Sequence, residues 1–256
     1  MRRLDRTLTT ALLPGKGDGQ IAPTALTGLD AVLDPTAHAT VASAVGGGLP
    51  RGQLSEIAGS RSSGRTTLLL QVLAAATRRG EMAALVDTFD RLDLASVVSA
   101  GVDLNRLLWI RGHDISGSQG SGALLDRTIE RALQALNLVL QAGGFGVVAI
   151  DLADTPSSAL HRIPFTTWLR VQRTIEGSDT VCVLVGPQPL ARSAGGLTLA
   201  LAGRARWAGH EGSGFGVSSR SCRLAGIDVT ARVVSPRRRV DGEITLGARV
   251  QECSGA

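Results

Sequence analysis

The stretch GSRSSGRTT, residues 59–67, decides the fold class of this chain. Gly59 and Gly64 stand at the spacing of the G-x-x-x-x-G-K-[ST] pattern, a loop whose backbone N–H groups hold phosphate at the start of a helix. Thr66 stands where this pattern places the hydroxyl that binds Mg²⁺, whereas Arg65 replaces the lysine. The stretch therefore predicts a phosphate-binding loop with an altered cation. Its candidate contact residues are Gly59, Ser60, Arg61, Ser62, Ser63, Gly64, Arg65, Thr66 and Thr67.

The segments on either side of the loop predict a strand and a buried helix. Residues 53–58 form a short run that we expect to be a strand leading directly into the loop. Residues 66–80, TTLLLQVLAAATRRG, are apolar almost all round and end in two arginines and a glycine, which is typical of a helix with a basic last turn and a glycine C-cap. Because a helix that is apolar on all sides is buried, we expect it to lie against a sheet.

Strand and helix patterns alternate along the rest of the chain. The strand-like runs lack polar alternation, which indicates a parallel sheet covered on both faces. The C-terminal part differs, because its strand-like runs are joined by the basic turn SPRRRVDG and predict an antiparallel edge. We therefore expect an α/β fold with a mostly parallel central sheet flanked by helices and with C-terminal antiparallel strands. Further strands are expected within 82–90, 107–111, 145–154, 180–186, 223–234 and 243–250, and further helices within 94–101, 122–143 and 165–177.

The pattern divides the chain into three regions. Residues 1–45 are expected to be a helical and linker segment, with a flexible joint at 14–23 and a short helix at 24–33. Residues 46–210 are expected to form the core, and residues 211–256 the C-terminal antiparallel strands with their basic turn.

Composition bounds the class of protein. The chain has 256 residues, 43% of them hydrophobic, which is enough for one sizeable core. Apolar segments do not reach the ~20 residues of a membrane span, and the apolar stretch at the start is too short for a secretory signal, so we expect a cytoplasmic protein with no membrane partner. Three cysteines stand far apart, without the spacing of a zinc site or a disulfide framework, and packing roles are expected for them: Cys182, Cys222 and Cys253.

Positive charge is carried almost entirely by arginine. The net charge is +5, the isoelectric point is near 10.3, and Lys16 is the only lysine. This balance is compatible with a nucleic acid or an acidic protein partner and does not distinguish between them. The densest cluster comprises Arg237, Arg238 and Arg239, which form either a solvated turn or a patch that contacts phosphate or an acidic partner.

Residues 46–108 resemble the core of the RecA recombinases. A glycine-rich approach, a strand ending in E-I-x-G, the loop S-S-G-[KR]-T-T, the helix L-x-L-Q-V-x-A-A-A and the segment G-V-D-L-N-x-L-L occur in the order and at the spacing of that family. Within the superfamily, GFGVVAIDLAD at 144–154, followed by R-I-P-x-T-T-W-L-R and an arginine-rich tail, is most similar to the ImuA-type proteins, RecA-like accessory factors of the bacterial translesion-synthesis complex. The resemblance implies a RecA-like core with a phosphate-binding loop.

The resemblance also implies roles for single residues. Asp151 ends an apolar run where the family places a carboxylate that, with Thr66, handles the Mg²⁺ of ATP; the alternative is a polar residue that simply ends a strand. RecA proteins carry a glutamate base two residues after the aspartate that ends the second strand, and here that position is Phe89, which accepts no proton. Arg65 keeps a positive charge but spreads it over a bulky planar group. We therefore expect ATP with Mg²⁺ as the only candidate cofactor, weak binding at most, and no hydrolysis.

The DNA-binding loops of the family are short in this sequence. The segments at 155–162 and 187–196 take their places, and neither contains an aromatic residue for base stacking. Arg162 and Arg192 remain as candidate phosphate contacts, while Trp109 and Trp168 are expected in the core. Gln188 lies near the position of the family's ATP-sensing glutamine.

Three functions follow from these observations. The first is a RecA-like docking protein of SOS-associated error-prone DNA repair, for which the resemblance implies an ImuB-type polymerase-like subunit, RecA, a replicative-type polymerase alpha subunit and DNA as partners. The second is an ATP-dependent RecA-paralogue recombinase that forms filaments on DNA. The third is a protein similar to the SOS cell-division inhibitors, which usually lack so complete a glycine loop.

Overall fold

The fold is built around a central β-sheet. The computed structural model describes residues 21–23, 48–113, 122–191, 196–208, 223–234 and 243–249. Its main sheet has eight strands in the order β10-β9-β8-β3-β7-β6-β4-β5, and a separate pair is formed by β1 (Ile21–Pro23) and β2 (Gly48–Pro50). The strands of the main sheet are β3 (Leu54–Gly59), β4 (Met82–Asp87), β5 (Leu107–Arg111), β6 (Phe145–Asp151), β7 (Val181–Gly186), β8 (Thr198–Ala208), β9 (Arg223–Val233) and β10 (Glu243–Arg249).

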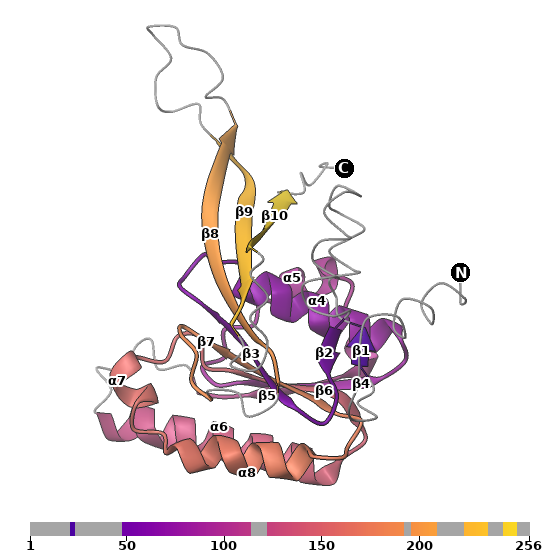
Figure 1. Ribbon diagram of the computed structural model, residues 1–256, viewed down its shortest axis with the longest axis vertical. Helices are drawn as coiled ribbons and strands as arrows, with labels where there is room; N and C mark the ends of the chain where they lie inside the picture. Colours follow the sequence, from indigo (N-terminus) through magenta and orange to yellow (C-terminus); the bar gives the residue numbers. More distant parts are fainter. Residues whose placement is uncertain are drawn as a thin grey trace, which may run out of the picture.

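The pairing of the strands changes once across the sheet, from parallel to antiparallel. The strands from β8 to β5 are parallel, and β9 and β10 then continue the sheet in antiparallel pairing. In Figure 1 the strands β8 and β9 extend well beyond the helices. The fold is therefore the expected α/β architecture, with a mostly parallel sheet and C-terminal antiparallel strands.

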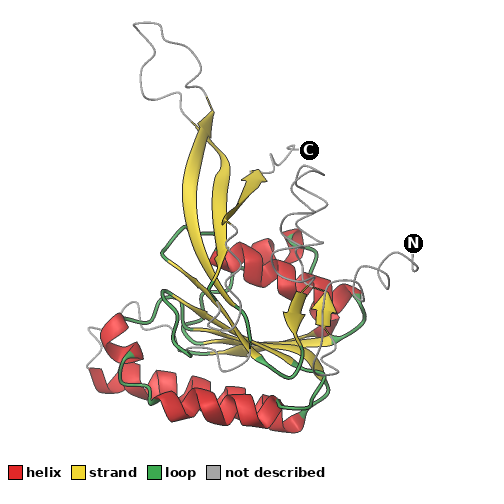
Figure 2. Ribbon diagram, viewed as in Figure 1, coloured by secondary structure: helices red, strands yellow, loops and turns green. Residues whose placement is uncertain are grey.

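Helices cover the parallel part of the sheet on both faces. On one face lie α4 (Arg65–Arg78) and α5 (Leu94–Ser99), and on the other lie α6 (Gly122–Ala142) and α8 (Phe165–Ile175), with the short α7 (Ser157–Leu160) at one end (Figures 1 and 2). A 3-10 turn at Leu104–Arg106 precedes β5. Two buried apolar clusters result, one on each face of the sheet. Burial on both faces is the reason that the strands read as continuous apolar runs.

The helix α4 follows from its sequence as predicted. Ten of its fourteen residues are buried, including Leu69, Leu73 and Ala74, and it packs among β3, β4, β6 and β7. Arg78 lies in its last turn, where a cation interacts favourably with the helix dipole. The expected amphipathic helix at 122–143 is likewise observed as α6, with Ile129, Leu136 and Leu140 among its buried side chains.

Two expectations need correction. Residues 21–23 were expected in a flexible joint, but Ile21–Pro23 pair with Gly48–Pro50 as antiparallel strands, because the glycine-rich approach to the core supplies an extended partner. Trp109 was expected in the core, but β5 is an edge strand, so the indole is only half-buried and lies under the guanidinium of Arg111 at 4.7 Å.

Other expectations are confirmed or lie outside the described residues. Trp168 and Cys182 are buried core residues, as expected. The expected helix at 24–33, Cys222 and Cys253 lie outside the described residues. Of the helices that the structure describes, none has the length and apolar character needed to cross a membrane.

The antiparallel strands pack directly on the glycine-rich loop. A Cβ built on Gly203 of β8 would lie 2.1 Å from the carbonyl oxygen of Ser62, and one built on Gly64 would lie 2.6 Å from Cγ2 of Val229 on β9. Real Cβ atoms essentially never come this close, so a Cβ at Gly203 would displace the backbone of Ser62, and one at Gly64 would displace the Val229 side chain and strain a backbone with φ of 86°. The loop and the ribbon of β8 and β9 are therefore one packed unit.

We predict that Gly203→Ala destabilises the protein by ~2 kcal/mol, because the new methyl group must push the backbone of the loop away from β8. Urea unfolding measures the difference. The matched control is Gly122→Ala, where a Cβ meets nothing within 4 Å at the start of α6 and alanine favours the helix. Equal stabilities of Gly203→Ala and the unsubstituted protein would contradict the packing described here.

Candidate functional site

The loop between β3 and α4 has the shape of an anion cradle. Ser62 and Gly64 both adopt left-handed backbone conformations, with φ of 59° and 86°, and the N–H of Ser63 donates to the carbonyl of Ser60 at 3.2 Å. Successive turns of this kind point backbone N–H groups inward. The helix α4 then begins at Arg65, and its N-cap, Gly64, makes no side-chain capping bond. The first turn of α4 therefore offers its N–H groups and its positive dipole end to an anion.

The first glycine of the loop is required by close packing. A Cβ built on Gly59 would lie 2.3 Å from Oγ of Ser63 and 2.8 Å from the carbonyl oxygen of Leu201 on β8. Ser63 is fully buried beneath the loop, and its hydroxyl has no hydrogen-bond partner within the described residues. Ser63 therefore contributes to the packing of the loop and does not line the pocket described below.

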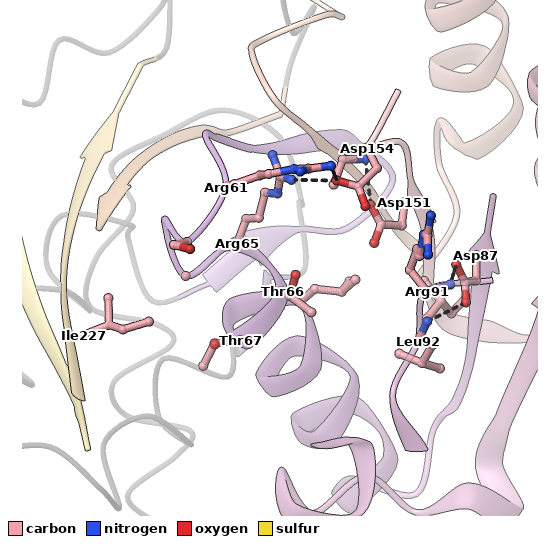
Figure 3. Close-up of a pocket in the computed structure, with 15 residues that line it drawn as sticks. Arg61, Arg65, Thr66, Thr67, Asp87, Arg91, Leu92, Asp151, Asp154 and Ile227 are labelled. Atoms are coloured by element: carbon pink, nitrogen blue, oxygen red, sulfur yellow. Dashed lines mark hydrogen bonds and ion pairs between the residues drawn. The ribbon is translucent and has the colours of Figure 1, made fainter. Parts of the chain in front are cut away.

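A pocket of about 400 Å³ opens in front of the loop. Figure 3 shows its walls, which come from the loop, from the first turn of α4, from the ends of β4 and β6 and from β9. The structure brings seven of the predicted site residues to this pocket and leaves Gly59, Ser60 and Ser63 outside its lining. The seven are Arg61, Ser62, Gly64, Arg65, Thr66, Thr67 and Asp151.

Arg65 is tied to its own loop. Its side chain is only 7% exposed, its Nη1 donates to the carbonyl oxygen of Gly59, and its Nη2 lies 3.6 Å from Oδ1 of Asp154. Arg61 approaches the same oxygen of Asp154 at 3.4 Å. A lysine has a compact charge that can follow a phosphate, whereas this planar guanidinium already has partners on two sides. Arg65 therefore keeps the charge of the loop but has little freedom to move.

Asp151 is a pocket carboxylate for which the described residues show a backbone N–H partner and no direct ion pair. Its Oδ1 accepts a hydrogen bond from the N–H of Ala153 at 2.8 Å. Burial, with a smaller contribution from the charge of Asp87, raises the pKa of Asp151 to about 6, against the opposing effects of that hydrogen bond and of the Arg65 charge. A divalent cation beside Asp151 would relieve this cost, because it favours the ionised form.

The position expected for a general base is occupied by a buried phenylalanine. Phe89 is 4% exposed and does not line the pocket. The two nearest carboxylates already have partners: Asp87 accepts hydrogen bonds from the N–H groups of Arg91 and Leu92, at 2.9 and 2.8 Å, and Asp90 forms a bidentate pair with Arg111 at 2.8 and 2.7 Å. Asp87 also accepts from the indole of Trp109. These carboxylates therefore hold the turn after β4 in place.

The residues fit a nucleotide that carries its own metal ion. Within the described ranges, no group of three or more His, Cys, Asp or Glu side chains could hold a metal ion alone. Magnesium usually binds through one or two protein groups together with substrate phosphates. Thr66, which is exposed, and Asp151 line the same pocket and would supply those two groups, while the loop N–H groups would hold phosphate.

Other predicted contact residues lie elsewhere. Arg162 follows α7, is exposed and pairs with Asp126 of α6, outside this pocket. Gln188 also lies away from the pocket, where its amide meets the ring of His161 at 3.3 Å. Arg192, Arg237, Arg238 and Arg239 lie outside the described residues.

Sequence reasoning missed several residues that line the pocket, among them Asp154, Arg91, Leu92 and Ile227. Asp154 follows Asp151 by three positions, and this spacing within one turn was the available signal. Arg91 and Leu92 follow β4, and their N–H groups hold Asp87. Ile227 comes from β9, and only the pairing of β9 with β8 places it near the loop.

We predict that Asp151→Asn stabilises the protein at pH 7.5 by ~1–2 kcal/mol, because the folded protein raises the pKa of this carboxyl to about 6 and so disfavours its ionised form. Asparagine can still accept from Ala153. The gain is expected to shrink as the pH falls from 7.5 to 4.5, since the native aspartate then takes up its proton. Urea unfolding at both pH values measures it, with Asp126→Asn as a control. A gain that grows towards acid pH would refute this account.

Comparison with known proteins agrees with this geometry. Residues 26–159 match the family described as the RecA N-terminal domain. Two of the similar curated proteins, both named Protein RecA, come from Nitratiruptor sp. (31% identical over 168 residues, 63% of this chain) and Methylococcus capsulatus (39% identical over 130 residues, 50% of this chain). The aligned parts cover 42% and 33% of those two relatives, so the chain spans well under half of their length. The cradle, the pocket and the match over half of its residues show that this chain belongs to the RecA family.

Proposed function

We propose that this chain is a RecA-like accessory protein of error-prone DNA repair, which acts as a docking subunit and does not hydrolyse ATP. One observation carries the proposal: every carboxylate that lines the pocket already has a partner, and the expected base position holds a buried phenylalanine. Asp87 bonds to backbone N–H groups, Asp154 faces two arginines, and Asp151 lies where the metal ion is expected. The pocket carboxylates are thus engaged within the protein or lie at the expected metal position, and the expected base position holds no acid–base group.

The cation of the loop supports the same proposal. Catalysis of phosphoryl transfer depends on charges placed where negative charge develops in the transition state. Arg65 is held by Gly59 and faces Asp154, so its charge is partly neutralised within the protein. The proposed site therefore binds phosphate weakly and stabilises the transition state poorly.

The proposed partners rest on the resemblance to the ImuA-type proteins. They are an ImuB-type polymerase-like subunit and RecA, with a replicative-type polymerase alpha subunit and DNA as further candidates. The short segments that follow β6 and β7 support a role other than strand exchange. The first forms the small helix α7, and in the second the N–H groups of Leu190 and Ala191 bond to the buried carboxylate of Glu56.

A second candidate function is an ATP-dependent recombinase. The similarity to proteins named RecA and the complete glycine loop favour it. The two candidates differ in one measurable property, which is the turnover of ATP on DNA.

We predict that the purified chain with Mg²⁺, ATP and single-stranded DNA releases phosphate no faster than its Asp151→Asn variant. That variant is the matched background, because it removes the carboxylate expected beside the metal ion and keeps the fold. Enzymes commonly turn over ~10 times per second. Phosphate release of about 1 per second that is lost in Asp151→Asn would establish the recombinase instead.

We also predict that the chain captures the polymerase-like subunit and RecA with equal yield in EDTA without nucleotide and in Mg²⁺ with ATP. The physical reason is that a docking surface needs the fold and not the chemistry of the pocket. Pull-down with purified partners in both buffers measures the yields, and an unrelated protein on the same resin is the control. Capture that requires Mg²⁺ and ATP would contradict a docking role independent of nucleotide.

A further inference from the structure

Asp154 occupies a fixed turn at the rim of the pocket. Three hydrogen bonds hold the backbone around it: the N–H of Leu152 donates to Val185 at 2.9 Å, the N–H of Ala153 donates to Asp151 at 2.8 Å, and the N–H of Thr155 donates to Leu152 at 3.0 Å. Pro156 follows the turn and restricts the backbone further. The position of the Asp154 carboxylate is therefore set by the end of β6.

Two arginines of the loop approach this one carboxylate. Nη2 of Arg61 lies 3.4 Å, and Nη2 of Arg65 lies 3.6 Å, from Oδ1 of Asp154 (Figure 3). In a loop of this class the cation at position 65 reaches the outer phosphates of a nucleotide. Here the anion beside Arg65 is the carboxylate of the protein's own Asp154.

Exposure decides which of the two contacts matters. The side chain of Arg61 is 84% exposed, and a contact of so exposed a group is screened by solvent and weak. The side chain of Arg65 is 7% exposed and is held between the carbonyl oxygen of Gly59 and the carboxylate of Asp154. Arg65 is therefore the cation whose charge Asp154 neutralises, so that less of this charge is available to a bound nucleotide.

The charges around the pocket make a third phosphate unfavourable. Asp87, Asp151 and Asp154 line it together with Arg61, Arg65 and Arg91, so three carboxylates offset the three cations and leave no excess of positive charge for a third phosphate. The inner phosphates of a nucleotide do not need Arg65, because the N–H groups of the loop and of α4 hold them. The two inner phosphates thus have N–H donors in the loop and in α4, while the third phosphate would lie beside the Asp154 carboxylate.

We propose that Asp154 stands in for the third phosphate, so that this pocket takes a nucleoside diphosphate in preference to a triphosphate. The inference rests on the proposed function, because it names the ligand of that same non-hydrolysing site. The pocket volume of about 400 Å³ and its apolar walls, Leu92 and Ile227, leave room for the rest of a nucleotide beside the phosphates.

Isothermal titration calorimetry with ADP and with a non-hydrolysable ATP analogue, each with Mg²⁺, tests this. The proteins are the unsubstituted chain, Asp154→Asn, and the control Asp126→Asn, which removes a carboxylate paired with Arg162 outside the pocket. We expect the unsubstituted chain and the control to bind ADP about tenfold more tightly than the analogue. In Asp154→Asn the affinity for the analogue is expected to rise about tenfold, while that for ADP changes less than about threefold.

Several results would overturn the inference. These are equal ratios of the two affinities in the unsubstituted chain and in Asp154→Asn, tighter binding of the analogue by the unsubstituted chain, and binding of neither nucleotide by any of the proteins. Asp154→Ser repeats the test if the asparagine variant does not fold. Phosphate release from ATP, measured on the same samples, separates the two proposals: hydrolysis contradicts the proposed function, whereas a missing preference for ADP without hydrolysis contradicts only this inference.

Discussion

The close approach of the loop at 59–64 to the strand β8 is the constraint on which the site depends. Only glycine fits at Gly59, which meets Ser63 and Leu201, and at Gly203, which meets Ser62. This approach joins the end of β3 to the antiparallel ribbon and brings Ile227 of β9 to the pocket. The strand that precedes the loop, the helix that follows it and the ribbon beside it are therefore packed together at these glycines and along the pairing of β3 with β8.

The charges of the pocket follow from how each carboxylate is satisfied. Asp87 receives backbone N–H groups, and Asp154 lies against the arginines of the loop. Asp151 has one N–H donor and a share of the Arg65 charge, which do not offset its burial, so its pKa is raised to about 6. A carboxyl group whose ionised form is disfavoured by burial thus lies where a metal ion is expected.

Sequence reasoning reached the elements that local patterns determine. The apolar runs predicted β3, β4, β6 and β7, and the glycine spacing predicted the loop at 59–64, because both signals lie within one short segment. The pairing of Ile21–Pro23, the edge position of Trp109 and the approach of Ile227 depend on partners far away in the chain. Such contacts leave no local signal. Asp154 could be predicted in part: its position three residues after Asp151 is readable in the sequence, but its contacts with Arg61 and Arg65 are not.

The retention of the glycine loop has a structural explanation that does not require turnover. Gly59 and Gly64 are fixed by contacts with Ser63 and Val229, and these contacts exist without any nucleotide. The guanidinium of Arg65 adds a hydrogen bond to the carbonyl oxygen of Gly59 in the same loop. Its planar group has several N–H donors, whereas a lysine would offer one compact ammonium group. Substitution of either glycine would therefore be opposed by packing even in a chain that had lost its chemistry. Phe89 also has a packing role that needs no nucleotide, because its side chain is buried in the core.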